Sequence, residues 1–370
     1  MKVLYAGNTA NIGYNVVYHI RKINVNIELL MQKNPRVDSD PIVRDSTLNK
    51  IYPKWINFYD KTKSLWKINI LKKMQNYDLI LANSSLILYA YFSHKPYIIQ
   101  PIGSELRVTA FSKSLKGFLM RRSLRKANVV IIATPASELL IKKLKIKNYF
   151  MIPCHPEISF FNPGKTLKTD FNDNFTIFHP TNLNWKEKGN DILIKGVAIF
   201  LKKYPKTTLL IVEHGIDLKK TYELIKKLDI EKNIKFIKGP LIYEQLKFYY
   251  HNADVVADQF IGSEIGAIGR EVLCSQKPLL ANFDKVAYET QFDTAPPIMR
   301  ANTPDEVCSK LELLLDDETR DKYGKDGRLW MEKNNLMDAF VGKYKIICKS
   351  VISKENFEIL KTKIDNFENS

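Results

Sequence analysis

The chain has 370 residues, of which 45% are hydrophobic and 26% charged. This length corresponds to about two domains, and the composition is that of ordinary globular proteins, which excludes wholesale disorder, collagen-like repeats and small disulfide scaffolds. No apolar run approaches the ~18–20 residues that cross a bilayer, and residues 1–7 have too short an apolar core for a secretory signal. We therefore expect two packed domains and no membrane-spanning segment.

The strong positive charge suggests an anionic partner. Lys and Arg number 57 against 40 Asp and Glu, a net charge of +17. Nucleic acid, an anionic membrane face and phosphorylated small molecules all fit this charge. The basic residues are spread along the chain without a nucleic-acid motif, so we expect no nucleic-acid partner. The four cysteines lack metal-type spacing, which indicates reduced thiols in a cytoplasmic protein: Cys154, Cys274, Cys308 and Cys348.

Short apolar runs alternate with amphipathic stretches in the N-terminal part. The pattern predicts strands at residues 2–6, 77–82, 97–101 and 128–133, and helices at residues 14–22, 110–126 and 136–144. The strands are continuous apolar runs rather than alternating ones. Such strands are buried on both faces, as in a parallel sheet covered by helices.

The pattern pauses at a proline-rich segment and then restarts. Pro153, Pro156, Pro163 and Gly164 mark a candidate linker. Strands are then predicted at residues 175–179, 207–212, 234–238, 254–257 and 278–281, with a helix at 191–203. The fold class is therefore α/β, with two Rossmann-like, doubly wound parallel-sheet domains in tandem facing a cleft. The tail from residue 336 is predicted to be helical, without a strand.

Two loops of the first domain follow predicted strands. Gly7 and Gly13 flank a turn into a helix, where backbone N–H groups can meet an anion; a plain strand–helix turn explains them equally well. Gly103-Ser104-Glu105-Leu106-Arg107 combines a Gly-Ser turn with a carboxylate and a guanidinium, which suits sugar hydroxyls and phosphate. The alternative there is a helix N-cap with an internal Glu–Arg pair.

Two loops of the second domain offer groups for a phosphate. Residues 180–189 include Lys186 and Lys188, either of which suits a diphosphate, although solvated lysines are the simpler interpretation. Ser263-Glu264-Ile265-Gly266 precedes a helix whose first N–H groups can bind a phosphate oxygen. Glu271 lies a little over one turn into that helix, where it either reaches a ligand or only stabilises the helix dipole.

A basic stretch precedes the linker. Residues 113–126 contain no acidic residue but hold Lys113, Lys116, Arg121, Arg122, Arg125 and Lys126. Apolar residues recur beside them at helical spacing: Phe111, Leu115, Phe118 and Leu119. This composition is typical of a helix lying on an anionic membrane. An ordinary surface helix packed on the sheet is equally consistent with it.

Taken in this order, the loops resemble the retaining GT-B glycosyltransferases of family 4, glycosyl transferases group 1. The strongest segment is residues 253–283, where Gly266, Glu271 and Lys277-Pro278 match the family pattern. Ser263 stands where the family has its first acidic residue. Lys188 matches the lysine of the Arg…Lys-Gly loop, whose arginine position holds Leu183. Residues 103–107 are similar to the family's His-Gly-Ser/Thr-Asp loop, with Ile102 at the histidine position, and residues 212–215 occupy its Gly-x-Gly strand end.

The resemblance implies a sugar transfer from a nucleoside-diphosphate donor, without a metal or other cofactor. It implies an acceptor-binding domain at residues 1–160, a donor-binding domain at 161–335, and helices at 336–370 packing back on the first domain. Lys188, Glu264 and Glu271 would be catalytic. The donor would be bound by Gly13, Thr181, Asn182, Lys186, Lys188, Glu213, Ser263, Glu264, Ile265, Gly266 and Glu271, and the acceptor by Gly103, Ser104, Glu105 and Arg107.

The acceptor implied is a glycan or lipid-linked glycan of cell-surface polysaccharide or glycoconjugate synthesis. Together with the basic stretch at residues 111–126, this suggests a cytoplasmic protein that is peripheral on the inner face of the membrane. Two other functions stay open. The substitutions at Ser263, Leu183 and Ile102 are consistent with a nucleotide-sugar-binding protein without transfer activity. A nucleic-acid-binding protein is the remote alternative.

Overall fold

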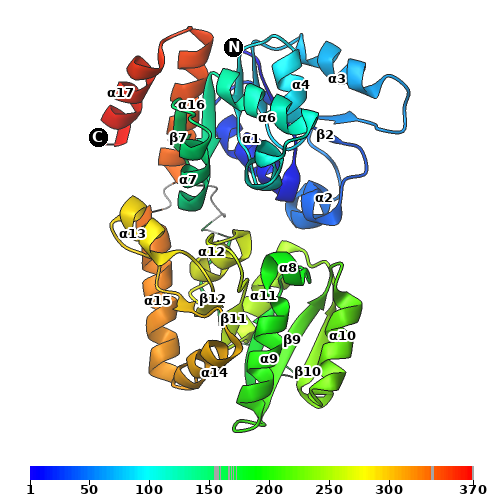
Figure 1. Ribbon diagram of the computed structural model, residues 1–370, viewed down its shortest axis with the longest axis vertical. Helices are drawn as coiled ribbons and strands as arrows, with labels where there is room; N and C mark the ends of the chain where they lie inside the picture. The colour runs from blue at the N-terminus through cyan, green and yellow to red at the C-terminus, as the bar shows by residue number, and fades with distance from the viewer. Residues whose placement is uncertain are drawn as a thin grey trace. The chain divides into compact units, whose positions relative to one another are not determined.

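The computed structural model describes residues 1–153, 158, 160–165, 167, 169, 171, 173–334 and 337–368. Its contacts divide the chain into two units (Figure 1). The N-terminal unit comprises Met1–Cys154 together with Leu336–Ser370, and the C-terminal unit comprises His155–Asn335. The end of the chain therefore belongs to the same unit as its beginning.

Seven parallel strands form the sheet of the N-terminal unit, in the order β3-β2-β1-β4-β5-β6-β7. Successive strands β1 to β3 are added toward one edge of the sheet, and β4 to β7 are added toward the other edge. The direction in which strands are added therefore reverses between β1 and β4. The strands are β1 (Val3–Ala6), β2 (Ile27–Gln32), β3 (Ile56–Tyr59), β4 (Leu79–Ala82), β5 (Tyr97–Ile99), β6 (Val129–Ile132) and β7 (Tyr149–Met151).

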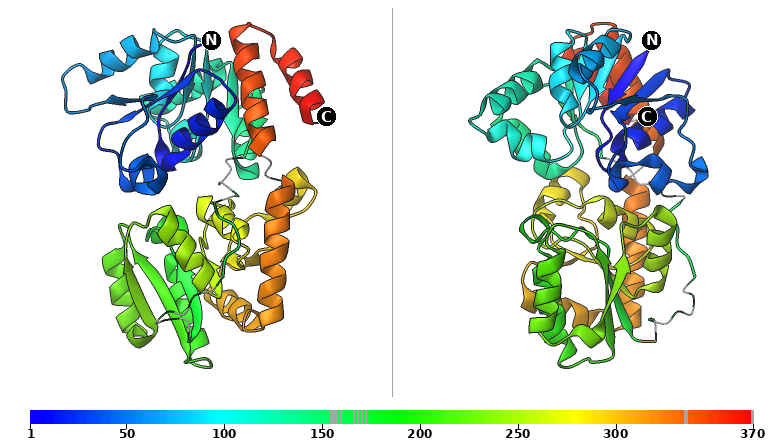
Figure 2. Two further views of the ribbon diagram at one scale, coloured as in Figure 1. Left: turned by 180° about the vertical axis from the view of Figure 1, so that it is seen from behind. Right: turned by 90° about the vertical axis from the view of Figure 1, so that its right-hand side faces the viewer.

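Helices cover both faces of this sheet (Figures 1 and 2). They are α1 (Ile12–Lys22), α2 (Pro41–Arg44), α3 (Trp66–Met74), α4 (Leu86–Phe92), α5 (Ser104–Arg107), α6 (Leu115–Lys126), α7 (Pro135–Lys143), α16 (Met337–Ile352) and α17 (Phe357–Glu368). The strands carry apolar side chains toward both faces, which gives the unit one core on each side of the sheet.

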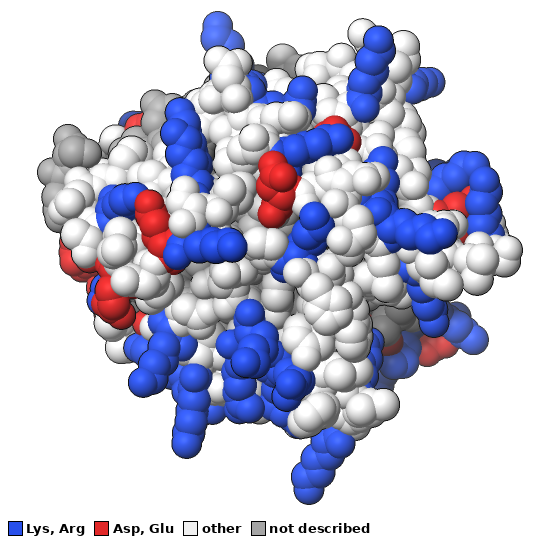
Figure 3. Space-filling view, turned by 90° about the horizontal axis from the view of Figure 1, so that it is seen from above, with Lys and Arg blue, Asp and Glu red and all other residues white. Residues whose placement is uncertain are grey.

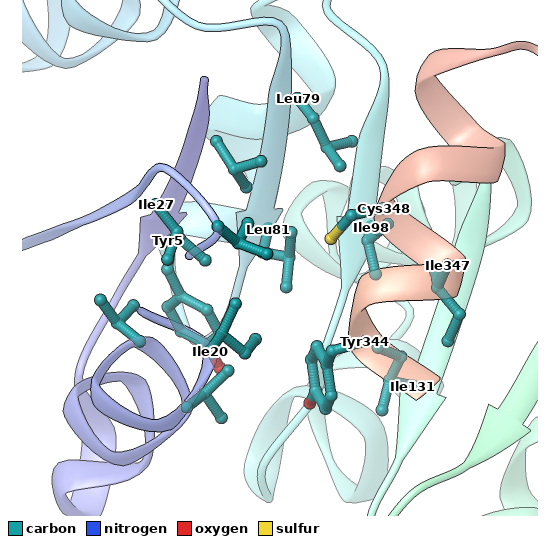
Figure 4. Packing of buried hydrophobic residues seen from close by; sticks show 14 of the residues in the cluster. Tyr5, Ile20, Ile27, Leu79, Leu81, Ile98, Ile131, Tyr344, Ile347 and Cys348 are labelled. Atoms are coloured by element: carbon teal, nitrogen blue, oxygen red, sulfur yellow. The ribbon is translucent and has the colours of Figure 1, made fainter. Parts of the chain in front are cut away.

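The last helices complete one of these cores. Tyr344, Ile347 and Cys348 of α16 are buried among strand residues of β1, β4, β5 and β6. Figure 4 shows Tyr344 and Cys348 pointing from α16 toward the sheet. Helix α17 adds Leu360 and Ile364 to the same core. Burial of this apolar face, at roughly 25 cal/mol per Å², binds the end of the chain to the N-terminal unit.

The C-terminal unit has six parallel strands in the order β10-β9-β8-β11-β12-β13. Its direction switches between β8 and β11. The strands are β8 (Phe175–His179), β9 (Thr207–Glu213), β10 (Ile234–Lys238), β11 (Val255–Ala257), β12 (Leu279–Ala281) and β13 (Met299–Arg300). The helices are α8 (Trp185–Lys188), α9 (Asn190–Leu201), α10 (Leu218–Lys227), α11 (Tyr243–Asn252), α12 (Ala267–Cys274), α13 (Lys285–Phe292), α14 (Pro304–Leu313) and α15 (Asp317–Asn334).

The prediction of two Rossmann-like parallel-sheet domains is confirmed, as is the helical tail. The helix predicted at residues 110–126 was too long, because α6 begins only at Leu115, where the Ser114 hydroxyl caps it by accepting from the Gly117 N–H (3.1 Å). The sequence pattern missed β2, β3, β7 and β13. Cys274, Cys308 and Cys348 are free, buried thiols as expected; Cys154 and Pro156 of the predicted linker lie outside the described residues.

Candidate functional site

Polar side chains gather at the switch point of the C-terminal sheet. In open parallel sheets, ligands bind beyond the carboxyl ends of the strands, where the strand order reverses. Here that point lies between β8 and β11. The loop after β8 supplies Thr181 and Lys188, and the loop after β11 supplies Asp258 and Gln259, and these two loops are hydrogen-bonded to each other.

The loop after β8 is shaped by its amide side chains. The Asn184 side chain caps the short helix α8 by accepting from the Glu187 N–H. Gly189, at φ +67°, ends α8 and turns the chain directly into α9, a conformation that favours glycine. Asn190 is fully buried and joins the two ends of the loop: its Oδ1 accepts from the Asn184 N–H (3.0 Å), and its Nδ2 donates to the Asn182 carbonyl (3.3 Å).

A buried histidine supports this loop from below. The Nδ1 of His179, the last residue of β8, donates to the carbonyl oxygen of Ala257 in β11 (2.8 Å). A carbonyl only accepts, so the proton is on Nδ1, and Nε2 accepts from the Asn190 amide (2.8 Å). Complete burial lowers the pKa of His179 below its usual value. The neutral ring therefore fixes the spacing of β8, β11 and the loop.

Lys188 ties the two loops together. Its Nζ donates to the Gln259 side-chain oxygen (2.8 Å), and its backbone carbonyl accepts from the Phe260 N–H (2.7 Å). The Gln259 amide in turn donates to the carbonyl of Glu264. Lys188 is half-buried and held by these contacts, whereas Lys186 is exposed. Of the two predicted lysines, the structure therefore brings only Lys188 to the loop that begins α12.

The start of α12 differs from the sequence-based expectation at one N–H group. We expected the backbone N–H groups of Ile265 and Gly266 to be available to an anion, but the Ile265 N–H donates to the Tyr288 hydroxyl (3.1 Å). Burial of Ile265 against that hydroxyl removes its N–H from solvent. Gly266 is half-exposed, and within the described part of the chain its N–H has no hydrogen-bond acceptor. Ser263 and Glu264 are half-buried beside it.

A carboxylate that sequence reasoning missed lies under this helix start. Asp258, the residue after β11, is 3% exposed, and its Oδ1 accepts from the Thr181 hydroxyl (2.7 Å). Its Oδ2 lies 3.5 Å from the position that a Cβ would take on Gly266. The available signal was a polar Asp-Gln pair directly after the apolar run of β11, at the strand end where ligand groups are expected.

The other candidates of the C-terminal unit are held by neighbouring side chains. Glu271 is 4% exposed, and its Oε2 accepts from the hydroxyl of the buried Tyr250 (2.8 Å). Glu213 ends β9 and accepts from the Tyr222 hydroxyl. Asn182 is half-buried in the loop after β8, next to Thr181. These residues all lie at or near the carboxyl ends of the strands or on α12.

The candidates of the N-terminal unit lie in two separate loops. Gly13 is buried in α1, and a Cβ there would come 2.1 Å from the carbonyl oxygen of Gly7, so close helix packing accounts for this glycine. Gly103 is the residue before α5, and its N–H donates to the carboxylate of Glu105 (3.0 Å). The Glu105 side chain therefore closes its own turn, while Ser104 and Arg107 are exposed.

The basic stretch forms α6 and the turn before it. Arg121 stabilises that turn, because its guanidinium donates to the carbonyls of Ala110 and Ser112 (2.8 and 2.7 Å). Large apolar side chains are exposed beside the basic ones: Phe111 (44%), Leu115 (74%) and Phe118 (50%). Basic side chains outnumber acidic ones on the face seen in Figure 3, and many lie together along its lower edge. This mixture is what an anionic, partly apolar surface would attract.

Metal-binding clusters and membrane-spanning helices are both absent from the described residues. Within those ranges there is no cluster of three His, Cys, Asp or Glu side chains suited to holding a metal ion. No helix in the same part of the chain combines the length and the apolar composition that spanning a membrane requires.

Part of the C-terminal unit and much of the chain are similar in sequence to known glycosyltransferases. Residues 168–281 match the family model for glycosyl transferases group 1, a segment that includes both Lys188 and the start of α12. A Haemophilus influenzae protein described as an uncharacterized glycosyltransferase is 25% identical over 268 residues, which are 69% of this chain and 71% of that protein.

Solved structures match nearly the whole chain. HepE from Anabaena, in complex with UDP and glucose, superposes with a TM-score of 0.74 at 15% identity, covering 95% of this chain and all of the other. Sucrose-phosphate synthase from Thermosynechococcus elongatus gives 0.72 at 14% identity, covering 96% of this chain and all of the other. The chain thus has the GT-B fold, and its C-terminal unit carries the glycosyl transferases group 1 pattern.

Proposed function

We propose that the protein is a retaining glycosyltransferase that moves a sugar, of the hexose type, from a nucleoside-diphosphate donor to a glycan or lipid-linked acceptor. The observation that carries this proposal is the convergence of Lys188 and the start of α12, which are joined through Gln259. A cation and a helix N-terminus aimed at one place form a site for a diphosphate. The family match over residues 168–281 and the GT-B fold support the same function.

The proposed reaction depends on stabilising the leaving group. As the bond between the sugar's anomeric carbon and the β-phosphate oxygen breaks, negative charge grows on the diphosphate. The Lys188 ammonium and the Gly266 N–H would stabilise that charge. The acceptor oxygen forms the new bond on the same face of the sugar, and its proton passes to the departing phosphate oxygen. The protein supplies no nucleophile and no general base in this scheme.

Other candidate residues take positioning roles in the proposal. Glu271 would accept the ribose hydroxyls after a change in its bond to Tyr250, and Glu264 would lie beside the sugar. Thr181, Asn182, Glu213 and Ser263 complete the proposed donor set, whereas Gly13, Lys186 and Ile265 are left out of it for the reasons given above. The loop of Gly103, Ser104, Glu105 and Arg107 would bind the acceptor. No metal or cofactor enters the proposed reaction.

Binding and transfer measurements test the donor site. UDP is the first probe, because HepE structures hold UDP and UDP-glucose, followed by GDP, ADP and their sugars. Loss of a charge-assisted hydrogen bond of about 1.5–3 kcal/mol predicts at least a tenfold weaker nucleotide affinity for Lys188→Ala. Lys202→Ala is the matched control, because Lys202 is exposed at the end of α9. Equal affinities in the two variants, or no nucleotide binding by the wild type, would contradict the proposed site.

A nucleotide-sugar-binding protein without transfer activity is the second candidate function. The buried Leu183 favours it, because this residue occupies the position of the family's arginine and lies in the apolar core instead of presenting a second cation. The two candidates differ in turnover. Slow hydrolysis or transfer from a bound nucleotide sugar supports the enzyme; tight binding without any release of nucleoside diphosphate over hours favours the binding protein.

We also propose an anionic membrane as a partner, with the protein on its cytoplasmic side. The exposed Phe111, Leu115 and Phe118 lie among Lys113 and Lys116, so insertion of rings and attraction of headgroups would act together. Flotation with anionic and neutral liposomes tests this. We expect binding to anionic vesicles only, reduced by Leu115→Ser together with Phe118→Ser; equal binding to both vesicle types would contradict the proposal.

A further inference from the structure

One acidic side chain at the switch point of the C-terminal sheet has no role in the scheme above. Asp258 follows β11, and its backbone N–H still donates to the Leu280 carbonyl of β12 (3.0 Å), so the residue is held by the sheet rather than by a free loop. It is 3% exposed. A carboxylate buried to this degree is costly unless its charge is compensated.

The two oxygens of Asp258 are used differently. Oδ1 accepts from the Thr181 hydroxyl (2.7 Å). Oδ2 has no hydrogen-bond donor within the described part of the chain. It lies against the start of α12, 3.5 Å from the Cβ position of Gly266 and equally far from that of Gly269. Gly266 is only partly buried, so a ligand that binds at the start of α12 comes close to Oδ2.

The charges around Asp258 indicate which kind of ligand group can bind there. The positive end of the eight-residue helix α12 compensates the buried charge. A second anion placed directly on Oδ2 would be repelled, whereas a hydroxyl group would donate to it. Lys188, which is tied to the next residue, Gln259, offers a cation to a diphosphate within the same loop assembly. One site thus presents a cation for phosphate and a carboxylate for a neutral hydroxyl.

We infer that Asp258 binds a hydroxyl of the donor's sugar and is a specificity-determining residue of the proposed transferase. The inference rests on the proposed function. It also accounts for Ser263, which stands where the resemblance places an acidic residue: the carboxylate comes from the end of β11 instead of from the loop before α12. A nucleotide without its sugar makes no use of Asp258.

The test compares the affinity of a nucleotide sugar with that of its nucleoside diphosphate. UDP with UDP-glucose, then GDP and ADP with their glucose and mannose forms, are titrated calorimetrically into the full-length protein. Asp258→Asn keeps the size of the side chain and its contact with Thr181. We expect this variant to bind the diphosphate within about twofold of the wild type and to lose tenfold or more in affinity for the nucleotide sugar. Asp229→Asn, the matched control, is expected to change neither value, because Asp229 is exposed in the turn before β10, at the opposite end of the sheet. Ser263→Ala is titrated beside it as the rival position for a sugar contact.

Each outcome decides between the inference and its alternatives. Equal losses for diphosphate and nucleotide sugar in Asp258→Asn would show that Asp258 only positions α12, which overturns the inference. A sugar-dependent loss in Ser263→Ala but not in Asp258→Asn would also overturn it. If the wild type binds a nucleotide sugar no more tightly than its diphosphate, the inference about Asp258 is overturned, but the proposed diphosphate site is not. If the wild type binds no diphosphate at all, the proposed function itself is refuted. If Asp258→Asn has a much lower melting temperature than the wild type, Asp258→Ser gives the same comparison of affinities.

Discussion

Asn190 offers a sharp test of how the candidate site is held in place. Its buried amide joins the Asn184 N–H, the Asn182 carbonyl and the His179 ring (3.0, 3.3 and 2.8 Å). Asn190→Ala removes these hydrogen bonds and leaves the His179 Nε2 buried without a donor. At about 1 kcal/mol for each of the three bonds, with about 1–3 kcal/mol more for the orphaned ring nitrogen, the loss is about 4–6 kcal/mol. The C-terminal unit is expected to melt roughly 8–24 °C lower.

The same substitution should weaken nucleotide binding, because Lys188 lies in the loop that Asn190 closes. Calorimetric scanning gives the melting shift, and titration with UDP well below the transition gives the affinity, which we expect to fall about three- to tenfold. Asn233→Ala is the control: the Asn233 amide also joins distant parts of the chain, here by donating to the carbonyls of Pro205 and Thr207, but at the opposite end of the sheet. It should cost stability without changing the affinity. Wild-type stability in Asn190→Ala, or an equal affinity in both variants, would refute the reasoning.

Three further predictions concern pH, packing and a buried carboxylate. Burial, with a smaller contribution from Lys22, lowers the pKa of His19 to about 4. Between pH 6.5 and 4 only the unfolded chain takes up this proton, so the free energy of unfolding should fall by about 3 kcal/mol on acidification. Urea unfolding should show a smaller fall in His19→Gln, and an equal fall in the two proteins would contradict this. Gly13→Ala, whose Cβ would lie 2.1 Å from an oxygen, should cost about 1–3 kcal/mol in urea unfolding; an unchanged midpoint argues against close packing there. Tyr250→Phe deprives the buried Glu271 of a hydrogen bond and should cost about 1–3 kcal/mol by the same assay; a free energy of unfolding equal to that of the wild type would contradict this.

The strands that sequence patterns predicted well are those buried on both faces. Residues 175–179 coincide with β8, and residues 207–212 with all but the last residue of β9, because a short apolar run between turn signals has few other stable solutions. By contrast, β2 carries Glu28 and Gln32 within its apolar run, and β3 is a half-exposed edge strand. Both lack the continuous apolar signal, so local patterns did not predict them.

The predicted site was limited by contacts between distant parts of the chain. Sequence order alone indicated that Lys188 and Gly266 follow strand ends, and parallel strands bring such ends to one edge of a sheet. The partners of these loops are another matter: Lys188 meets Gln259 across 71 positions, and Thr181 meets Asp258 across 77. Likewise, the Tyr288 hydroxyl takes the Ile265 N–H from another helix. Such pairings follow from packing rather than from local spacing.

The central claim is that the Lys188 ammonium and the start of α12 bind one diphosphate. A crystal structure of the protein with UDP tests it most directly. The account predicts a diphosphate oxygen within hydrogen-bond distance of the Lys188 Nζ and another within reach of the Gly266 N–H. A nucleotide bound with its diphosphate away from both groups would contradict it.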